Sequence, residues 1–199
     1  MPPDPLAAET PAPGFADPAR DAAQAFRALL EALARPGRPA TLGAGLAPPA
    51  PLSPAAGAAL LTLVDADAPV WLPPRLRGGA VEAWLRFHGS AAPAATPAAA
   101  AFAYGAWSEI APEIDALPAG TPAYPDRSAT LLLEVPARAP ETGPRLTGPG
   151  IEVAARLGAE LPADFWAARA AQPFPLGRDV FLFYGGTAVG LPRTTQAEI

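Results

Sequence analysis

The residues that most constrain the fold form a nearly continuous apolar run, TLLLEV, at positions 130–135. Glu134 is the one polar side chain after the initial threonine. A strand with one solvated face alternates apolar and polar residues, whereas a strand covered on both faces is apolar throughout. The run therefore predicts a central strand of a sheet that carries a layer of structure on each side.

Two glycines near the C-terminus, Gly185 and Gly186, separate apolar segments at residues 180–184 and 187–191. Two-residue hairpin turns need positive φ angles, which glycine adopts without strain. The pattern predicts a β-hairpin, whose antiparallel strands would make the sheet mixed. Further short strands are expected at residues 38–42, 70–72, 101–104 and 145–147.

Helices are expected between these strands. The first begins with Asp17 as its N-cap and Pro18 at the first helical position, and it ends at Pro36-Gly37. Its apolar residues recur at helical spacing and predict one apolar face: Phe26, Leu29, Leu30 and Leu33. Further helices are expected at residues 53–64, 79–87, 108–117 and 162–171. This alternation predicts an α/β fold, a three-layer sandwich around a mixed sheet.

The first 16 residues are rich in proline and show no hydrophobic period. Such a segment buries too little apolar surface to become ordered, so we expect a disordered tail over residues 1–16 and a single α/β domain over residues 17–199. The tail has no basic start followed by an apolar run, and a secretory signal is not expected. The uncharged stretch 90–107 contains two prolines and makes a poor membrane span. We expect a cytoplasmic protein that does not bind membranes.

The ionisable residues exclude several classes of function. The net charge is −5, and the longest basic cluster is Arg75 with Arg77, which disfavours nucleic acid as a partner. The absence of cysteine excludes thiol nucleophiles and iron–sulfur clusters, and the single histidine, His88, excludes a multi-histidine metal site within one chain. All 14 basic residues are arginine, which excludes a lysine Schiff base and the lysine of a P-loop. We therefore assign no catalytic residue, no metal site and no cofactor.

Six separated segments carry a resemblance to one known family. They lie in the same order as in the family, at residues 26–37, 60–72, 85–88, 146–151, 174–179 and 191–195. The longest reads LLTLVDADAPVWL, and the last two read FPLGRD and LPRTT. Together they resemble the PhnH family, the H subunit of the bacterial carbon–phosphorus lyase machinery.

This resemblance implies a role in the use of organic phosphonates as a phosphorus source. Members of the family act with partner subunits to transfer a ribose triphosphate unit from a nucleoside triphosphate such as ATP to an alkylphosphonate. They also sit in the core complex whose radical subunit breaks the carbon–phosphorus bond. The resemblance further implies a fold similar to that of PLP-dependent transferases but without PLP, and a homodimer when the subunit is isolated.

Asp65 and Asp67 form one candidate site for a nucleotide. Carboxylates at a helix C-terminus oppose the helix dipole, and Mg²⁺ bound to nucleotide phosphates would explain them through its preference for oxygen ligands. The alternative is that each aspartate caps a turn before the next strand.

Arg86 and His88 form a candidate anion site at the end of the third expected helix. A guanidinium matches phosphate or phosphonate oxygens, and an imidazole can donate to the same anion. Alternatively, Arg86 pairs with an acid and His88 is a hydrogen-bonded core residue. Arg193, with the two threonines that follow it, could meet phosphate or a partner chain, or could belong to a solvated C-terminal tail.

Three classes of function remain: an assembly subunit, a free-standing transferase, and a stand-alone binding protein for a small molecule or nucleotide. The missing lysine and cysteine and the single histidine disfavour the second class. The third does not explain the six segments. The sequence thus predicts an accessory subunit that shows no nucleotide turnover alone and restores transfer when it joins the other subunits.

Overall fold

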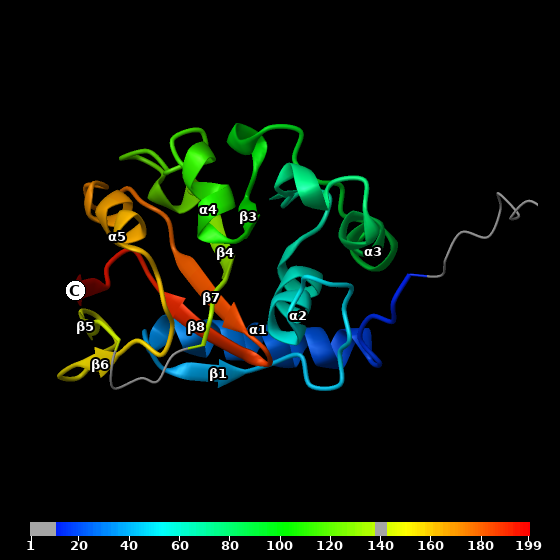
Figure 1. Cartoon of the computed structure of the whole chain (residues 1–199), viewed down its shortest axis with the longest axis horizontal. Helices are drawn as coiled ribbons and strands as arrows, with labels where there is room; N and C mark the ends of the chain where they lie inside the picture. The colour runs from blue at the N-terminus through cyan, green and yellow to red at the C-terminus, as the bar shows by residue number, and fades with distance from the viewer. Residues whose placement is uncertain (1–10, 138–142) are drawn as a thin grey trace, which may run out of the picture.

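Two sheets organise the computed structural model, which describes residues 11–137 and 143–199. The larger has six strands in the order β1-β8-β7-β4-β3-β2 (Figure 1). Its strands are β1 (Pro39–Thr41), β2 (Val70–Trp71), β3 (Phe102–Gly105), β4 (Thr130–Glu134), β7 (Val180–Tyr184) and β8 (Thr187–Leu191). Neighbours from β2 to β7 run parallel, whereas β8 pairs antiparallel with β7 and β1. The sheet is therefore mixed, as the sequence predicts.

The apolar run at 130–135 forms β4, which lies between β3 and β7. Its side chains alternate between the two faces of the sheet because successive residues of a strand point to opposite sides. Leu132 packs into one apolar cluster, and Leu131 and Leu133 pack into a second. The prediction of a central strand covered on both faces is confirmed.

The first outer layer consists of α1 (Pro18–Ala34), α2 (Pro54–Leu63) and α3 (Ala80–Gly89). The buried face of α1 differs from the predicted one, because Phe26 and Leu30 are 46% and 52% exposed whereas Leu29 is buried. Ala25 and Ala32 flank Leu29 on the buried face. These small residues let α1 lie directly on the sheet: a Cβ added to Gly190 of β8 would stand 2.3 Å from the Ala32 carbonyl oxygen.

The second outer layer consists of α4 (Trp107–Ile110), α5 (Ala163–Ala170) and the small sheet. Figure 1 shows α4 and α5 side by side, on the other side of the large sheet from α1. The small sheet has the order β6-β5-β9, with β5 at Arg145–Thr147, β6 at Ala155–Arg156 and β9 at Gln196–Glu198. The helix predicted at 108–117 is shorter, because Pro112 lacks the N–H that would continue it and a 3₁₀ turn follows instead.

These layers confirm the predicted α/β sandwich, and the remaining expected helices and strands occur near their predicted positions. Residues 1–10 of the predicted tail lie outside the described residues. The segment that follows contacts α3: the Trp84 indole N–H donates to the Pro13 carbonyl oxygen, and Phe15 packs against the first cluster. Within residues 11–137 and 143–199, no helix has the length and hydrophobicity to cross a bilayer.

Candidate arginine-lined site

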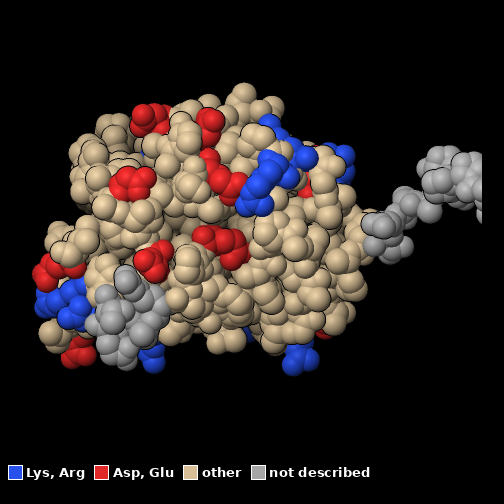
Figure 2. All heavy atoms as spheres, in the orientation of Figure 1, with Lys and Arg blue, Asp and Glu red and all other residues tan. Residues whose placement is uncertain are grey.

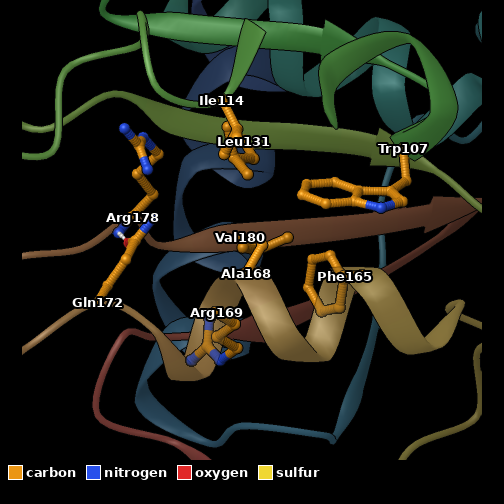
Figure 3. Close-up of a pocket in the computed structure, with 9 residues that line it drawn as sticks. All are labelled: Trp107, Ile114, Leu131, Phe165, Ala168, Arg169, Gln172, Arg178 and Val180. Carbon is orange, nitrogen blue, oxygen red and sulfur yellow. Dashed lines mark hydrogen bonds between the residues drawn. The ribbon is translucent and has the colours of Figure 1, made fainter. Parts of the chain in front are cut away.

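A small hollow of about 20 Å³ lies where α5 covers the beginnings of β4 and β7 (Figure 3). One part of its wall is apolar, and the other part carries two arginines and an amide. The apolar part is formed by Trp107, Ile114, Leu131, Phe165, Ala168 and Val180, and the polar part by Arg169, Gln172 and Arg178. The Trp107 indole N–H donates to Asp164 of α5 over 3.0 Å. The Trp107 ring also packs edge to face against Phe165, so both contacts join α4 to α5.

Arg178 is the most buried charged residue of this site, with 7% of its surface exposed. Its guanidinium donates to the Leu117 carbonyl oxygen, and its backbone N–H donates to the Gln172 side chain over 3.2 Å. Its Nε atom is buried and has no hydrogen-bond partner among the described residues. Burial lowers the pKa of Arg178, and the negative charge of Asp115 opposes this effect. A cationic donor thus remains unused in a mostly apolar setting.

Arg169 extends from α5 to the carboxyl end of β8. Its guanidinium donates to the carbonyl oxygens of Leu191, Pro192 and Thr195. Burial lowers the pKa of Arg169 to about 10, with the charge of Asp179 opposing and that of Arg193 adding to this shift. These bonds fix the turn between β8 and β9, so Arg169 has a structural role at the edge of the hollow.

Arg193 lies in this turn, beside a second, larger hollow of about 380 Å³ that also contacts Arg169 and Gln172. All five of its guanidinium N–H donors are used within the chain. Two of its bonds go to Asp179, with the shorter ion-pair distance at 2.8 Å, and the others go to Ser128 and two carbonyl oxygens. The solvated-tail alternative is wrong, because Thr195 is 5% exposed and β9 follows it in the small sheet. Anion binding by Arg193 stays a prediction that would require this network to open.

Asp65 and Asp67 lie in the exposed loop between α2 and β2. One carboxylate oxygen of Asp65 accepts the backbone N–H groups of Asp67 and Ala68, over 2.9 and 2.8 Å. This is the turn-capping geometry of aspartate. Among the described residues, no cluster of three or more acidic, histidine or cysteine side chains could hold a metal ion.

Arg86 and His88 occupy the last turns of α3. Arg86 pairs with Glu82 one turn earlier, over 2.7 Å, and its side chain is 65% exposed. His88 is exposed, and its Nε2 lies 2.9 Å from the Ala12 carbonyl oxygen. Arg86 therefore pairs with an acid, as the alternative to anion binding predicts. His88 connects the N-terminal segment to α3.

The predicted candidates form two separate groups. The end of α3 lies beside the end of α2, where a Cβ on Gly89 would stand 3.4 Å from the Val64 carbonyl oxygen, so Asp65 and His88 belong to one region. Arg193 is six residues before the C-terminus, which Figure 1 marks at the other end of the long axis from α3. The sequence interpretation missed Arg169, Gln172 and Arg178, although segment 174–179 in the resemblance contains Arg178.

A second polar cluster lies at the opposite, carboxyl end of β4. Glu134 accepts the Ser53 backbone N–H over 2.8 Å and the Tyr104 hydroxyl over 3.1 Å. Burial raises the pKa of Glu134, while these hydrogen bonds oppose the shift. Glu109 of α4, the helix that follows β3, forms an ion pair with Arg75. This pair holds the pKa of the Glu109 carboxyl below its ordinary value. Both hydrogen bonds of Glu134 join elements of the fold, so we assign this cluster a structural role at the start of α2.

The surface charge gives no competing site on the face shown in Figure 2, where charged side chains form small groups of mixed sign on a largely uncharged surface. The region beside α5, where the small hollow adjoins the larger one next to Arg193, is the best candidate for a ligand. Its guanidinium and amide groups can bind an oxyanion, and its aromatic and aliphatic wall can bind an apolar group.

Residues 13–198 match the family described as bacterial phosphonate metabolism protein (PhnH). The chain belongs to the PhnH family. A relative in this family, the alpha-D-ribose 1-methylphosphonate 5-triphosphate synthase subunit PhnH of Rhizobium meliloti (strain 1021), is 41% identical over 190 residues. The alignment covers 92% of this chain and 94% of the relative. The family resemblance expected from six segments is confirmed, and the PhnH match includes α5, the hairpin and the turn that holds Arg193.

Proposed function

We propose that this chain is the H subunit of a synthase that forms α-D-ribose 1-methylphosphonate 5-triphosphate in bacterial phosphonate catabolism. The observation that carries this proposal is the 41% identity to a subunit of that name over almost the full length of both chains. The family description, which names bacterial phosphonate metabolism, supports the same role.

The chain acts in this synthase together with other subunits of the carbon–phosphorus lyase machinery, and the ribose triphosphate unit comes from ATP. We assign the bond-forming chemistry to a partner subunit. The sequence contains no cysteine and no lysine, so the chain cannot ligate an iron–sulfur cluster through thiolates or hold PLP as a Schiff base, and the radical step of the pathway belongs to another subunit. The isolated chain then has no synthase activity and needs no cofactor of its own.

We further propose that the isolated chain is a cytoplasmic homodimer and that its fold is similar to that of PLP-dependent transferases. The mixed sheet with helical layers on both faces is compatible with such a fold. Light scattering coupled to gel filtration would measure the mass directly. A mass twice that of the 20.2 kDa chain supports the homodimer, and a mass equal to one chain contradicts it.

The alternative is a stand-alone binding protein for a small molecule or nucleotide, and the arginine-lined hollow gives it a site. The two functions differ in their need for partners. A stand-alone protein would bind its ligand with the same affinity whether or not other subunits are present, and it would not replace a subunit in a synthase.

Growth complementation tests the proposed function. A Rhizobium meliloti strain that lacks its own H subunit would receive this chain and grow with methylphosphonate as the sole phosphorus source. We expect growth to return, with the native subunit as positive control and growth on inorganic phosphate as the viability control. A chain that is made and folded in this strain but does not restore growth would contradict the proposal.

A further inference from the structure

The outer side of α1 carries a line of apolar residues that stay exposed to solvent. Phe26 and Leu30 are 46% and 52% exposed and lie one turn apart, because helical residues four positions apart share a face. Three exposed alanines continue the same line along the helix: Ala19, Ala23 and Ala34. The apolar stripe at positions 19, 23, 26, 30 and 34 therefore repeats every three or four residues, the spacing of a helix that packs against another helix.

This stripe differs from the other exposed apolar side chains. Among the described residues, the remaining large ones lie on separate elements: Phe87, Tyr124, Val153, Phe174 and Ile199. Single exposed apolar residues are ordinary, whereas a contiguous apolar patch usually marks an interaction surface. The 17 residues of α1 make a helix about 25 Å long, which runs along the long axis of the molecule in Figure 1. The whole stripe can therefore meet one elongated partner.

We propose that this stripe packs against the α1 stripe of a second copy of the chain, with the two helices antiparallel across a two-fold axis. The proposal names the interface of the proposed homodimer, on which it rests. A two-fold interface uses the same surface on both copies, so that surface must be complementary to itself. Two properties of α1 meet this requirement in one register.

The first property is the charge beside the stripe. Arg20 and Glu31 flank the stripe on the same side, because eleven residues make three helical turns with only about 20° left over. Both side chains are exposed, and Arg20 forms no ion pair within residues 11–137 and 143–199. When Arg20 lies opposite Glu31 of the partner subunit, the two-fold axis forms this pair twice. The two helix dipoles are then antiparallel as well, which is favourable.

The second property is the size of the apolar side chains. In the register that pairs Arg20 with Glu31, Ala23 falls between Phe26 and Leu30 of the partner subunit. Leu30 falls between Ala19 and Ala23 of the partner subunit, and Phe26 lies next to the two-fold axis. Large residues therefore meet small ones, as in helix pairs that pack the ridges of one helix into the grooves of the other.

Sedimentation velocity of the full chain over a range of concentrations tests the apolar contact. We expect wild type to form a dimer with twice the mass of the 20.2 kDa chain. In Phe26→Glu, we expect the dissociation constant to rise about tenfold or more, because a carboxylate near the two-fold axis would leave water without a partner. The matched control Phe87→Glu makes the same change at a phenylalanine of α3 that is 65% exposed, and it should dimerise as wild type does. Circular dichroism would verify that both variants are folded.

Charge reversal tests the antiparallel register. Arg20→Glu alone places two carboxylates opposite each other, and Glu31→Arg alone places two guanidinium groups opposite each other. We expect each single variant to weaken the dimer about fivefold, the effect of losing two exposed ion pairs. The double variant Arg20→Glu/Glu31→Arg forms the pairs in the reverse sense and should dimerise as tightly as wild type.

The proposal is overturned if wild type is a monomer at every concentration, or if Phe26→Glu dimerises as tightly as Phe87→Glu. It is also overturned if the double charge variant dimerises no better than the single variants. A Phe26→Glu chain that stays dimeric but no longer joins the other synthase subunits would assign the stripe to one of those subunits. Growth complementation tests the synthase role and sedimentation tests the interface, so failure of either one is recognised separately.

Discussion

Arg169, Arg178 and Arg193 lie in one region of the molecule but have different hydrogen-bond partners. Arg193 is fully bonded within the chain, and Arg169 holds three carbonyl oxygens after β8. Arg178 keeps an unused buried donor. A structural arginine is expected to have partners for its donors, so this difference separates Arg178 from its neighbours.

Replacing Arg178 should not destabilise the fold. In Arg178→Met an apolar side chain of similar length replaces an incompletely bonded buried charge, and such replacements are often neutral or stabilising. We expect the free energy of unfolding in urea to stay the same or to rise by up to about 2 kcal/mol, since the lost bond to Leu117 offsets part of the gain. A loss larger than about 1 kcal/mol would show that Arg178 mainly supports the fold.

Gly190 should be intolerant of any side chain. A Cβ there would stand 2.3 Å from the Ala32 carbonyl oxygen, so Gly190→Ala must push α1 away from the sheet. We expect a loss of about 1–3 kcal/mol in the free energy of unfolding, as for overpacked cores. Gly186→Ala in the same hairpin is the matched control, because its nearest neighbour would be 3.7 Å away. Equal stability of the two variants would contradict the close contact between α1 and β8.

Local features of single residues were predictable from the sequence. Asp17 was expected as an N-cap, and its side chain accepts the backbone N–H of Arg20. Ser53, the first residue of the helix expected at 53–64, caps α2 in the same way by accepting the Ala56 N–H. The role of Arg178 was not predictable, because its environment comes from Leu117, Gln172 and the β4–β7 pair, which are distant in the chain. No local pattern shows whether an arginine donor is left without a partner.

At the scale of elements, the start of α2 joins three parts of the fold. Ser53 caps the helix through its hydroxyl, its backbone N–H donates to Glu134 of β4, and Glu134 also accepts the Tyr104 hydroxyl of β3. These contacts position α2 over the sheet, and α2 in turn contacts α1 in the same apolar layer.

The cap itself should have a measurable effect on stability. Ser53→Ala removes the acceptor for the Ala56 N–H but keeps the backbone bond to Glu134. We expect a loss of about 1 kcal/mol in the free energy of unfolding, the usual value for an N-cap serine. The exposed Ser108→Ala serves as the control and should change stability by less than about 0.5 kcal/mol. A Ser53 variant as stable as this control would argue against the cap.

Glu134 should make stability depend on pH in a defined direction. Because burial raises its pKa in the folded state, the folded chain binds this proton more tightly than the unfolded chain. The stabilisation is complete below the ordinary glutamate pKa and is lost as the pH rises through the raised value. Glu134→Gln removes this titration and keeps an oxygen acceptor for Ser53 and Tyr104.

Urea unfolding of wild type and Glu134→Gln at several pH values measures this effect. The stability of the glutamine variant relative to wild type should increase as the pH rises from about 4 towards neutrality. A difference that is constant with pH, or that changes in the opposite direction, would contradict the raised pKa of Glu134.

Elements with a strong local pattern were predicted well, and those defined by distant pairing were not. The hairpin of β7 and β8 follows from its two glycines and apolar flanks. The small sheet was largely missed because β6 has two residues, and β9 pairs with β5 some 50 residues earlier in the chain. The predicted apolar face of α1 was wrong in part, since Ala32 and Gly190 decide which side of the helix approaches the sheet.

At the scale of the whole molecule, two apolar clusters on opposite faces of the six-stranded sheet give a three-layer fold. The candidate site lies between the sheet and the layer that contains α5. The cationic side chains of this site are arginines, whose planar groups suit an anion with several oxygens.

The central claim is that this PhnH-family chain contributes to the synthase only as one of its subunits. Phosphorus NMR of reactions with ATP and methylphosphonate measures the ribosyl phosphonate product directly. We expect no product from the purified chain alone, none from the remaining subunits alone, and product when they are combined. Product formed by the isolated chain, or equal product from the other subunits without it, would contradict this account.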